Sequence, residues 1–312
     1  MQRNILKEII SYKINWIDRR KKIQPLASFR DKIKKTKRNF KKSLQKDRLS
    51  FILELKKASP SLGVIKKDFN IKKILKVYKK YATAISVLTD SQFFQGDFEF
   101  LSIVHAHTIQ PILCKDFFID PYQIYLARYY QADAILLILS ILNDEEYLFL
   151  SKTAKSMNMH ILTEINNNTE LERAISLKAE IIGINNRNLK NFIIDINITK
   201  NLAYKIPKKI IIISESGISN YQTVKKLSKF VHGFLIGSAL MKSSDLDLAV
   251  RRIIFGNNKI CGLTLLEDVK VSKKAGAIYA GMIFAHQSPR KILLENAAKI
   301  IHTVPLRYVG VF

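Results

Sequence analysis

Short apolar runs alternate with amphipathic segments along most of this chain. Runs of β-branched and aliphatic residues are typical of strands covered on both faces, and they occur over residues 49–56, 84–90, 111–116, 134–141, 160–165, 181–185, 209–214 and 233–237. A helical pattern follows each run, over residues 70–82, 98–107, 121–131, 144–157, 168–178, 197–205, 220–229 and 245–255. Eight strands that alternate with eight helices predict an α/β fold with a closed parallel (β/α)8 barrel.

A doubly wound open sheet is the competing architecture for such an alternation. It normally carries a glycine-rich phosphate turn after its first strand. Here the segment Ser59-Pro60-Ser61-Leu62-Gly63 follows that strand and lacks the GxGxxG pattern. The helix-start pairs Asp120-Pro121, Asn143-Asp144 and Asn168-Thr169 stand where N-caps are expected and support the division into strands and helices. The barrel is therefore the favoured fold.

The two ends of the chain depart from this alternation. Residues 3–24 predict an extra N-terminal helix, and a basic segment that continues to residue 48 is expected to pack on the outside of the barrel. After Gly256 the pattern restarts with strands near 259–264, 277–285 and 307–312 and helices near 265–275 and 292–302. Three strands cannot close a barrel, so we expect the first three strands of a second, incomplete one. The predicted domains are residues 1–48, 49–256 and 257–312.

The net charge of +26 on 312 residues raises the question of nucleic-acid binding. Lysines are spread through most segments, and only residues 30–48 form a dense basic tract without any accompanying nucleic-acid motif. We therefore expect no nucleic-acid partner, and the charge favours anionic substrates. The two cysteines form no metal motif, and the longest apolar stretch, 134–142, is too short to span a membrane. These features predict a cytoplasmic protein without a membrane partner.

Ionisable residues end several of the apolar runs, although Lys and Glu are almost never fully buried unless paired. In a barrel enzyme the reacting groups lie at the carboxyl ends of the strands and in the loops that follow. Shared burial shifts the pKa values of neighbouring charges, which suits acid–base catalysis. Structural ion pairs between strands are the alternative interpretation. The candidate catalytic residues are Glu54, Lys56, Lys115, Glu164, Asn185, Glu215 and Ser216.

Glycine and serine follow the last two strands of the predicted barrel, where barrel enzymes commonly bind phosphate. The segments are Glu215-Ser216-Gly217-Ile218 and Leu235-Ile236-Gly237-Ser238. Phe94 and Phe117 follow the second and third strands, where they either pack within loops or contact an aromatic substrate. The candidate binding residues are Ser59, Ser61, Phe94, Phe117, Arg187, Gly217, Leu235, Gly237 and Ser238.

Four stretches resemble the indole-3-glycerol-phosphate synthase family: Phe51-Ile-Leu-Glu-Leu-Lys-Lys-Ala-Ser-Pro-Ser, Pro111-Ile-Leu-Cys-Lys-Asp-Phe, Ile182-Gly-Ile-Asn-Asn-Arg-Asn-Leu and Ser214-Glu-Ser-Gly-Ile. The resemblance runs from the N-terminal helix to about residue 255. It implies an enzyme of tryptophan biosynthesis that needs no metal or organic cofactor, and we expect this enzyme to be a monomer. The implied substrate is 1-(2-carboxyphenylamino)-1-deoxyribulose 5-phosphate, which ring closure with loss of CO₂ and water converts to indole-3-glycerol phosphate.

The same resemblance assigns roles at the strand ends. It implies that Lys115 is the general acid at the substrate carbonyl, and that Glu164 and Lys56 handle later proton transfers. Glu54 is expected to orient a lysine, and Asn185 to position the substrate with Arg187 as its supporting charge. Glu215 and Ser216 match the wall of the site, whereas Ser59, Ser61, Gly217, Gly237 and Ser238 match its phosphate side. Ala58 departs from relatives that carry a lysine there, which should weaken one phosphate contact.

The restart after residue 256 resembles the start of phosphoribosylanthranilate isomerase, through Lys259-Ile-Cys-Gly-Leu-Thr and Ser288-Pro-Arg. This resemblance implies that Cys261 is a general base and that Arg290 meets the anthranilate carboxylate. We expect the second domain to be truncated and the 312-residue polypeptide to lack isomerase activity. The alternatives for the whole chain are another phosphate-binding barrel enzyme and a basic, non-enzymatic nucleic-acid-binding protein on a decayed barrel.

Overall fold

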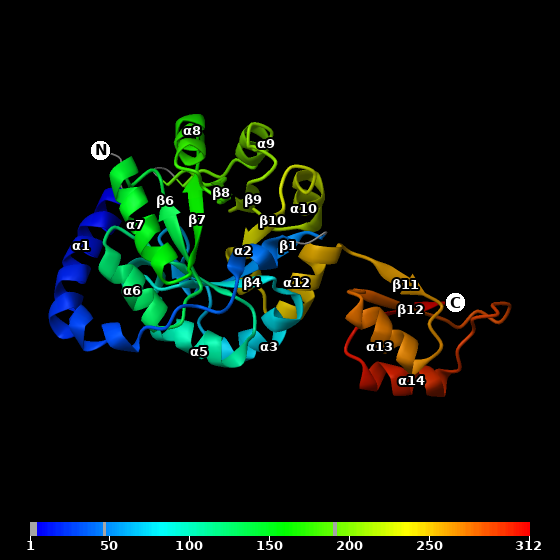
Figure 1. The fold of residues 1–312 in the computed structure, drawn as a ribbon. Helices are drawn as coiled ribbons and strands as arrows, with labels where there is room; N and C mark the ends of the chain where they lie inside the picture. The colour runs from blue at the N-terminus through cyan, green and yellow to red at the C-terminus, as the bar shows by residue number, and fades with distance from the viewer. Residues whose placement is uncertain (1–4, 46–47, 190–191) are drawn as a thin grey trace. The chain divides into compact units, whose positions relative to one another are not determined.

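The predicted closed barrel is present in the structure, a computed structural model that describes residues 5–45, 48–189 and 192–312. Eight parallel strands close in the order β1-β10-β9-β8-β7-β6-β5-β4, and helices surround them (Figure 1). The strands are β1 (Ser50–Leu55), β4 (Ala84–Leu88), β5 (Ile112–Lys115), β6 (Ala134–Ile138), β7 (His160–Ile165), β8 (Ile181–Asn185), β9 (Ile211–Glu215) and β10 (Gly233–Ile236). The prediction of a (β/α)8 barrel is confirmed.

The chain divides into two compact units. The first contains the barrel and comprises residues up to Ile218 together with Leu227–Lys242, and the second comprises Ser219–Lys226 and Ser243–Phe312. Within the described residues, no helix is long and apolar enough to cross a membrane. The helices of the first unit are α1 (Ile5–Ile23), α2 (Phe40–Leu44), α3 (Ile71–Tyr81), α4 (Ser91–Phe94), α5 (Glu99–His107), α6 (Pro121–Tyr129), α7 (Asp144–Ser156), α8 (Asn168–Ser176), α9 (Asn197–Ala203) and α11 (Ser238–Met241).

Local side-chain caps start several of these helices. Asp120 and Asn143 each form a capping box, with Gln123 and Glu146 respectively, which satisfies backbone N–H groups that a helix start otherwise leaves unpaired. Asn167 caps α8, one residue before the position expected from the sequence, and its side chain accepts a hydrogen bond from the Glu170 N–H. These side-chain caps thus determine the residues at which the loops at the carboxyl end of the barrel stop and the helices begin.

The interior of the barrel is filled by alternate residues of its strands. Ile52 of β1, Leu113 of β5, Leu162 of β7 and Leu235 of β10 belong to one buried cluster. Alternation along each strand means that the next inward-facing residue, two positions later, points toward the carboxyl end of the barrel. Along each strand, the inward-facing residue of the apolar core is therefore followed, two positions later, by a residue of a different layer at the carboxyl end of the barrel.

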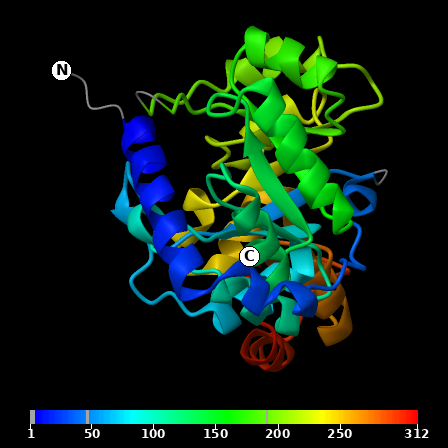
Figure 2. The same cartoon turned by 60° about the vertical axis from the view of Figure 1, so that its left-hand side comes forward.

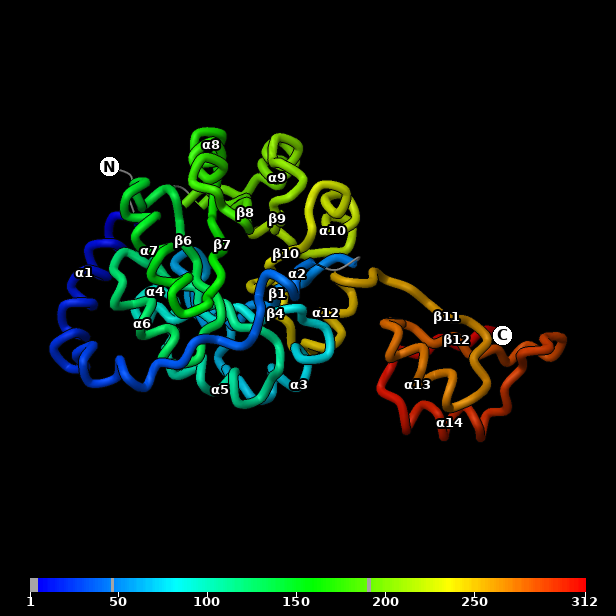
Figure 3. Tube along the Cα trace, in the orientation of Figure 1, coloured from blue at the N-terminus to red at the C-terminus, as the bar shows by residue number. Residues whose placement is uncertain are grey.

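The basic N-terminal segment contributes to this core. α1 runs along the outside of the barrel, and the chain then continues past two 3₁₀ turns, Leu26–Ser28 and Arg30–Lys32, to α2 (Figures 2 and 3). Phe40 and Leu44 of α2 are fully buried in the interior cluster. The sequence predicted a segment on the outside, but these two side chains close the base of the barrel. Residues 3 and 4 of the predicted N-terminal helix and Lys46 of the basic tract lie outside the described residues.

The loop after β1 folds back on itself as a short hairpin, with β2 (Ala58–Ser59) paired antiparallel to β3 (Gly63–Val64). The second unit contains a parallel sheet in the order β11-β12-β13. Its elements are α10 (Tyr221–Leu227), α12 (Leu246–Phe255), β11 (Lys259–Cys261), α13 (Leu266–Lys274), β12 (Tyr279–Ile283), α14 (Leu294–Thr303) and β13 (Arg307–Val311). The predicted three strands after residue 256 are thus present, with their own buried core around Val269 and Met282.

Candidate active site

Lys115 lies at the centre of a cluster of charges at the carboxyl end of the barrel. Its Nζ is 2.8 Å from Glu215 Oε2, 3.7 Å from Glu164 Oε2 and 3.8 Å from Glu54 Oε2. Burial alone would lower the pKa of Lys115, but the carboxylates of Glu215, Glu54 and Glu164 outweigh it and raise that pKa well above its ordinary value. Four different strands thus deliver one ammonium group and three carboxyl groups to one place.

Glu54 connects this cluster to a second lysine. Its Oε1 is 2.5 Å from the Nζ of Lys56, which follows β1 by one residue. Burial alone would raise the pKa of Glu54, but the charges of Lys56 and Lys115 outweigh it and lower that pKa. A Cβ at Gly237 would lie 2.3 Å from Glu54 Oε1, so the carboxylate packs directly on the backbone after β10. The absence of a side chain at Gly237 makes room for the charge of Glu54.

The carboxyl group of Glu215, like that of Glu54, occupies space that is available only because a neighbouring residue is a glycine. Its Oε1 lies 2.1 Å from where a Cβ on Gly183 would stand, and residues 183 and 215 belong to the neighbouring strands β8 and β9. Burial is the main cause that raises the pKa of Glu215, to about 7; Lys115 opposes this effect and Glu164 adds to it. Glu215 therefore changes charge near neutral pH.

We expect Gly183→Ala to lower kcat/KM for the reaction of this site by roughly 10- to 100-fold, because displacement of a positioned group by about 1 Å has effects of that size. The added methyl group would occupy the position of Glu215 Oε1 and force the carboxylate away from Lys115. Steady-state kinetics measure the loss. Ile182→Val in the same strand, where the side chain points to the other face, is the matched control. Wild-type kcat/KM in folded Gly183→Ala would show that the approach of Glu215 is unimportant.

Because the pKa of Glu215 is raised to about 7, we expect activity and stability to depend on pH in opposite directions. We expect kcat/KM to fall as the pH drops below about 7, because protonation weakens the Glu215–Lys115 ion pair. The folded-state pKa is raised above the ordinary 4.5, so the stability contribution of Glu215 is fully present below pH 4.5 and is lost as pH rises through about 7. The melting temperature of Glu215→Gln relative to that of the wild type should therefore be higher at pH 8 than at pH 5.

Both trends can be measured with the same pair of proteins. Kinetics between pH 5.5 and 9 should show an inflection near neutrality in the wild type that is absent in Glu215→Gln, whose activity is low throughout. Thermal unfolding at pH 5 and pH 8 gives the stability difference. An unchanged acidic limb in Glu215→Gln would assign the inflection to another group, and equal melting-temperature differences at both pH values would contradict the raised pKa.

Glu164 belongs to a chain of hydrogen bonds that leads away from Lys115. Its Oε1 accepts a hydrogen bond of 3.0 Å from Asn185 Nδ2, and Asn185 Oδ1 accepts one of 2.9 Å from the Arg187 N–H. The Arg187 guanidinium donates to the Phe192 carbonyl at 3.1 Å and to Ser61 Oγ at 3.5 Å. One network therefore runs from the carboxylate cluster to the hairpin after β1.

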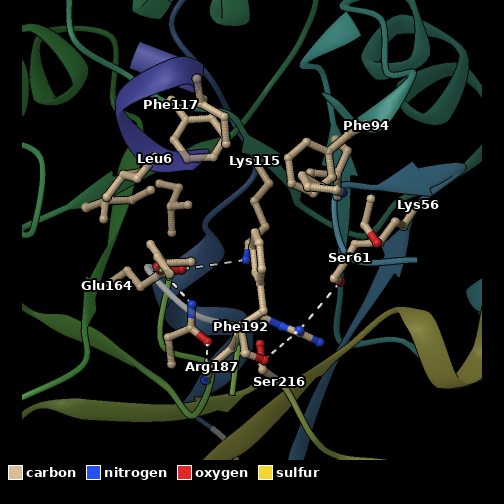
Figure 4. Close-up of a pocket in the computed structure, with 18 of the residues that line it drawn as sticks. Leu6, Lys56, Ser61, Phe94, Lys115, Phe117, Glu164, Arg187, Phe192 and Ser216 are labelled. Carbon is tan, nitrogen blue, oxygen red and sulfur yellow. Dashed lines mark hydrogen bonds and ion pairs between the residues drawn. The ribbon is translucent and has the colours of Figure 1, made fainter. Parts of the chain in front are cut away.

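These groups line a pocket that contains about 800 Å³ of space free of atoms, part of it open to solvent. Figure 4 shows Leu6, Phe94 and Phe117 on one side of it, Arg187 and Ser216 on the other, and Lys115 between them. The rings of Phe94 and Phe117 lie 6.2 Å apart between centroids. The pocket therefore has an apolar aromatic end and a polar end, with the charged cluster between the two.

The structure brings most of the predicted site residues to this pocket. Those that line it are Glu54, Lys56, Ser59, Ser61, Phe94, Lys115, Phe117, Glu164, Asn185, Arg187, Ser216 and Ser238. Glu215 does not line the pocket itself but contacts Lys115, which does. Gly237 packs against Glu54, and Gly217, with φ +79°, lies against Ile194. Leu235 is buried in the apolar cluster below the pocket. The structure thus places Leu235, Gly217 and Gly237 beside or beneath the pocket lining.

Several lining residues have no counterpart among the sequence candidates. Ile5, Leu6 and Ile9 come from α1, and Leu189 and Phe192 come from the loop after β8. The helical period of α1 indicated an apolar face, but not which part of the barrel it covers. Ser216 was a sequence candidate, but its backbone conformation was not predicted. Its φ is +65°, which is uncommon for a residue with a side chain, and this conformation turns the chain sharply after β9. A run of Ser-Gly directly after a strand could have indicated this turn.

The candidates in the second unit also lie together. Arg290 Nη1 donates a 3.2 Å hydrogen bond to the Cys261 carbonyl, and a Cβ on Gly262 would lie 2.8 Å from Arg290 Cδ. Cys261 itself is partly buried at the end of β11. In the part of the chain that the structure describes, no group of three or more His, Cys, Asp or Glu side chains could hold a metal ion.

A closed parallel barrel with charged side chains from several strand ends around one pocket defines a (β/α)8-barrel enzyme. The sequence model of indole-3-glycerol phosphate synthase matches residues 6–253, and that of N-(5'phosphoribosyl)anthranilate (PRA) isomerase matches residues 258–312. The chain belongs to the indole-3-glycerol phosphate synthase family, and its last 55 residues match the isomerase family.

Curated relatives match along nearly the whole chain. The tryptophan biosynthesis protein TrpCF of Buchnera aphidicola subsp. Baizongia pistaciae (strain Bp) is 60% identical over 311 residues, which are 99% of this chain and 66% of the relative. TrpCF of Salmonella typhi is 55% identical over 308 residues, 99% of this chain and 68% of the relative. The chain therefore spans about two thirds of the length of these relatives.

A solved structure shares the fold at low sequence identity. Thiamine phosphate pyrophosphorylase from Pyrococcus furiosus superposes with a TM-score of 0.50 at 15% identity, over 68% of this chain and 94% of that one. At this identity the likeness concerns the barrel fold alone.

Proposed function

We propose that this chain catalyses the conversion of 1-(2-carboxyphenylamino)-1-deoxyribulose 5-phosphate to indole-3-glycerol phosphate, a step of tryptophan biosynthesis. The observation that carries the proposal is the position of Lys115, held by three carboxyl groups between an aromatic and a polar end of one pocket. Membership of the synthase family and the 55–60% identity to TrpCF proteins support it. No comparison supports the alternative of a basic binding protein.

The two ends of the pocket suit the two ends of this substrate. Phe94, Phe117 and Leu6 offer an apolar surface for the aryl ring. Arg187, Ser59, Ser61, Ser216 and Ser238 offer donors for the phosphate at the polar end. The ribulose carbonyl would then lie near Lys115, which is charged because its pKa is raised. The positive charge of the protein also favours the approach of an anionic substrate.

The reaction joins the ring carbon that bears the carboxylate to the carbonyl carbon. As this bond forms, Lys115 donates a proton to the carbonyl oxygen, which becomes a hydroxyl group. The carboxylate leaves as CO₂, and its bonding electrons restore the aromatic ring. The hydroxyl group leaves as water after it takes a proton, and a proton is lost from the neighbouring carbon to complete the indole. Glu164 and Lys56 serve these later transfers, and Glu54 orients Lys56 through their ion pair.

Further parts of the proposal concern the chain as a whole. We propose the domain boundaries 1–48, 49–256 and 257–312, a monomer, and cytoplasmic localisation. We also propose that residues 257–312 belong to an isomerase barrel in which Cys261 is the base and Arg290 contacts the anthranilate carboxylate.

An indole-fluorescence assay on the purified protein tests the main proposal. We expect indole-3-glycerol phosphate to accumulate with time and enzyme concentration, without added metal or cofactor. Retention on a DNA column that salt abolishes, together with no turnover, would instead favour the basic binding protein. A folded but silent protein would refute the proposed function.

A further inference from the structure

A lysine of the N-terminal helix is buried against the outer wall of the pocket. Lys13 has a side chain that is only 1% exposed, although it belongs to a helix whose other charged residues mostly face solvent. Its Nζ lies 2.8 Å from Asp90 Oδ2 and 2.6 Å from Asp116 Oδ1, and both carboxylates are fully buried. Burial alone would lower the pKa of Lys13, but Asp116 and Asp90 raise it. A charged lysine therefore joins α1 to two loops of the barrel mouth.

Each of the two aspartates also shapes the loop to which it belongs. Asp90 is the N-cap of α4 and accepts a 2.7 Å hydrogen bond from the Phe93 N–H. Asp116 accepts one of 2.7 Å from the Phe117 N–H and another of 2.7 Å from Thr89 Oγ1. α4 ends at Phe94, and Phe94 and Phe117 form the aromatic end of the pocket. Lys13 thus holds the two segments that carry the aromatic rings.

The helix that carries Lys13 supplies the rest of this apolar end. Leu6 and Ile9 line the pocket, and they precede Lys13 by seven and four residues, so all three lie on one face of α1. Beside Lys13, Tyr12 packs edge-on against Phe93 with 5.7 Å between ring centroids. The ion pairs of Lys13 therefore fix the position of Leu6 and Ile9 relative to Phe94 and Phe117.

We propose that Lys13 is a positioning residue that sets the width of the aromatic end of the pocket through its ion pairs with Asp90 and Asp116. This proposal rests on the proposed function, in which that end binds the aryl ring. The aryl ring already contacts this end of the pocket in the bound substrate, so we expect a wider pocket to raise KM more than it lowers kcat. Lys115 keeps its own carboxylate partners in either case. A purely structural ion pair would instead lower the melting temperature and leave KM as it is.

Three variants separate these roles. Lys13→Met keeps the length of the side chain and removes its charge. A triple variant, Lys13→Met with Asp90→Asn and Asp116→Asn, leaves no unpaired charge in the protein interior, which is the usual reason for unfolding after such a change. Lys21→Met is the matched control, because Lys21 also belongs to α1 and forms an ion pair, at 2.6 Å with Asp120, but is 42% exposed.

We expect roughly a tenfold rise in KM in Lys13→Met and in the triple variant, with kcat within about threefold of wild type. Lys13→Arg, which keeps the charge on a differently shaped head group, should recover part of the loss, and Lys21→Met should have wild-type kinetics. Acrylamide quenching of Trp16, the single tryptophan of the chain, reports whether α1 remains packed. If Lys13→Met does not fold, the triple variant decides.

Wild-type KM in a folded Lys13→Met or triple variant would overturn the proposal, as would an equal rise of KM in Lys21→Met. A silent wild-type enzyme would refute the proposed function instead. In that case the role of Lys13 is tested by equilibrium binding of anthranilate, the free aryl portion of the substrate. The proposal requires that Lys13→Met binds anthranilate more weakly than the wild type and Lys21→Met do. Equal binding by all three proteins would overturn it.

Discussion

Replacement of Lys115 by methionine is expected to lower kcat by about 1000-fold or more, since loss of a positioned general acid removes roughly 10²–10⁴ in rate. The substitution also leaves Glu215, Glu164 and Glu54 without their shared positive charge. Methionine has nearly the length of lysine, so the pocket keeps its shape. Indole fluorescence measures turnover, and circular dichroism at matched concentration shows whether the fold is retained.

Lys152→Met provides the control for this experiment. Lys152 is exposed on α7, so its loss changes the net charge by the same amount without a change in the pocket, and wild-type kcat is expected. Lys115→Met with more than a tenth of the wild-type kcat would show that another group protonates the carbonyl oxygen, and would move the centre of the site away from Lys115.

Replacement of Phe40 by alanine is expected to lower the free energy of unfolding by about 3–5 kcal/mol, the usual cost of deleting a fully buried aromatic side chain. Phe40 is 0% exposed and packs with Leu44 in the interior cluster at the base of the barrel. Its loss leaves a cavity that the closed sheet of strands cannot easily fill. Urea unfolding gives the difference from wild type.

Phe149→Ala is the matched control for stability. Phe149 lies on α7 and is 57% exposed, so the same substitution there should change the free energy of unfolding by less than about 0.5 kcal/mol. A difference below about 1 kcal/mol for Phe40→Ala would show that the N-terminal segment only covers the outside of the barrel, as the sequence alone suggested.

The barrel and the centre of its site were predictable from the sequence because two simple patterns coincide. Buried strands appear in the sequence as continuous apolar runs. Charged residues are rarely buried without a partner, so the charged residues that interrupt or end these runs indicate a functional site: Glu54, Lys115, Glu164 and Glu215. The inward alternation that packs Ile52 and Leu113 into the core then places Glu54 and Lys115 above it.

Other parts of the fold and of the site depend on contacts that the sequence does not encode locally. Lys13 lies in a helix rich in lysine and arginine, and nothing in its neighbours distinguishes it from exposed residues such as Lys21. Phe40 and Leu44 stand within a basic tract whose charges conceal two buried side chains. The requirement for a glycine at position 183 follows only from the position of Glu215 on the adjacent strand. In each case the partner is distant in the chain, so only the closed fold reveals the role.

The most direct test of the central claim measures CO₂ and indole-3-glycerol phosphate in the same reaction. The substrate, 1-(2-carboxyphenylamino)-1-deoxyribulose 5-phosphate, is labelled with carbon-14 in its carboxylate, and released ¹⁴CO₂ is compared with indole fluorescence over time. The proposed reaction predicts equal amounts of both products from the wild-type protein and formation of both at a rate about 1000-fold lower, or less, from Lys115→Met. CO₂ without an indole product, or no release of either by the folded wild-type protein, would contradict it.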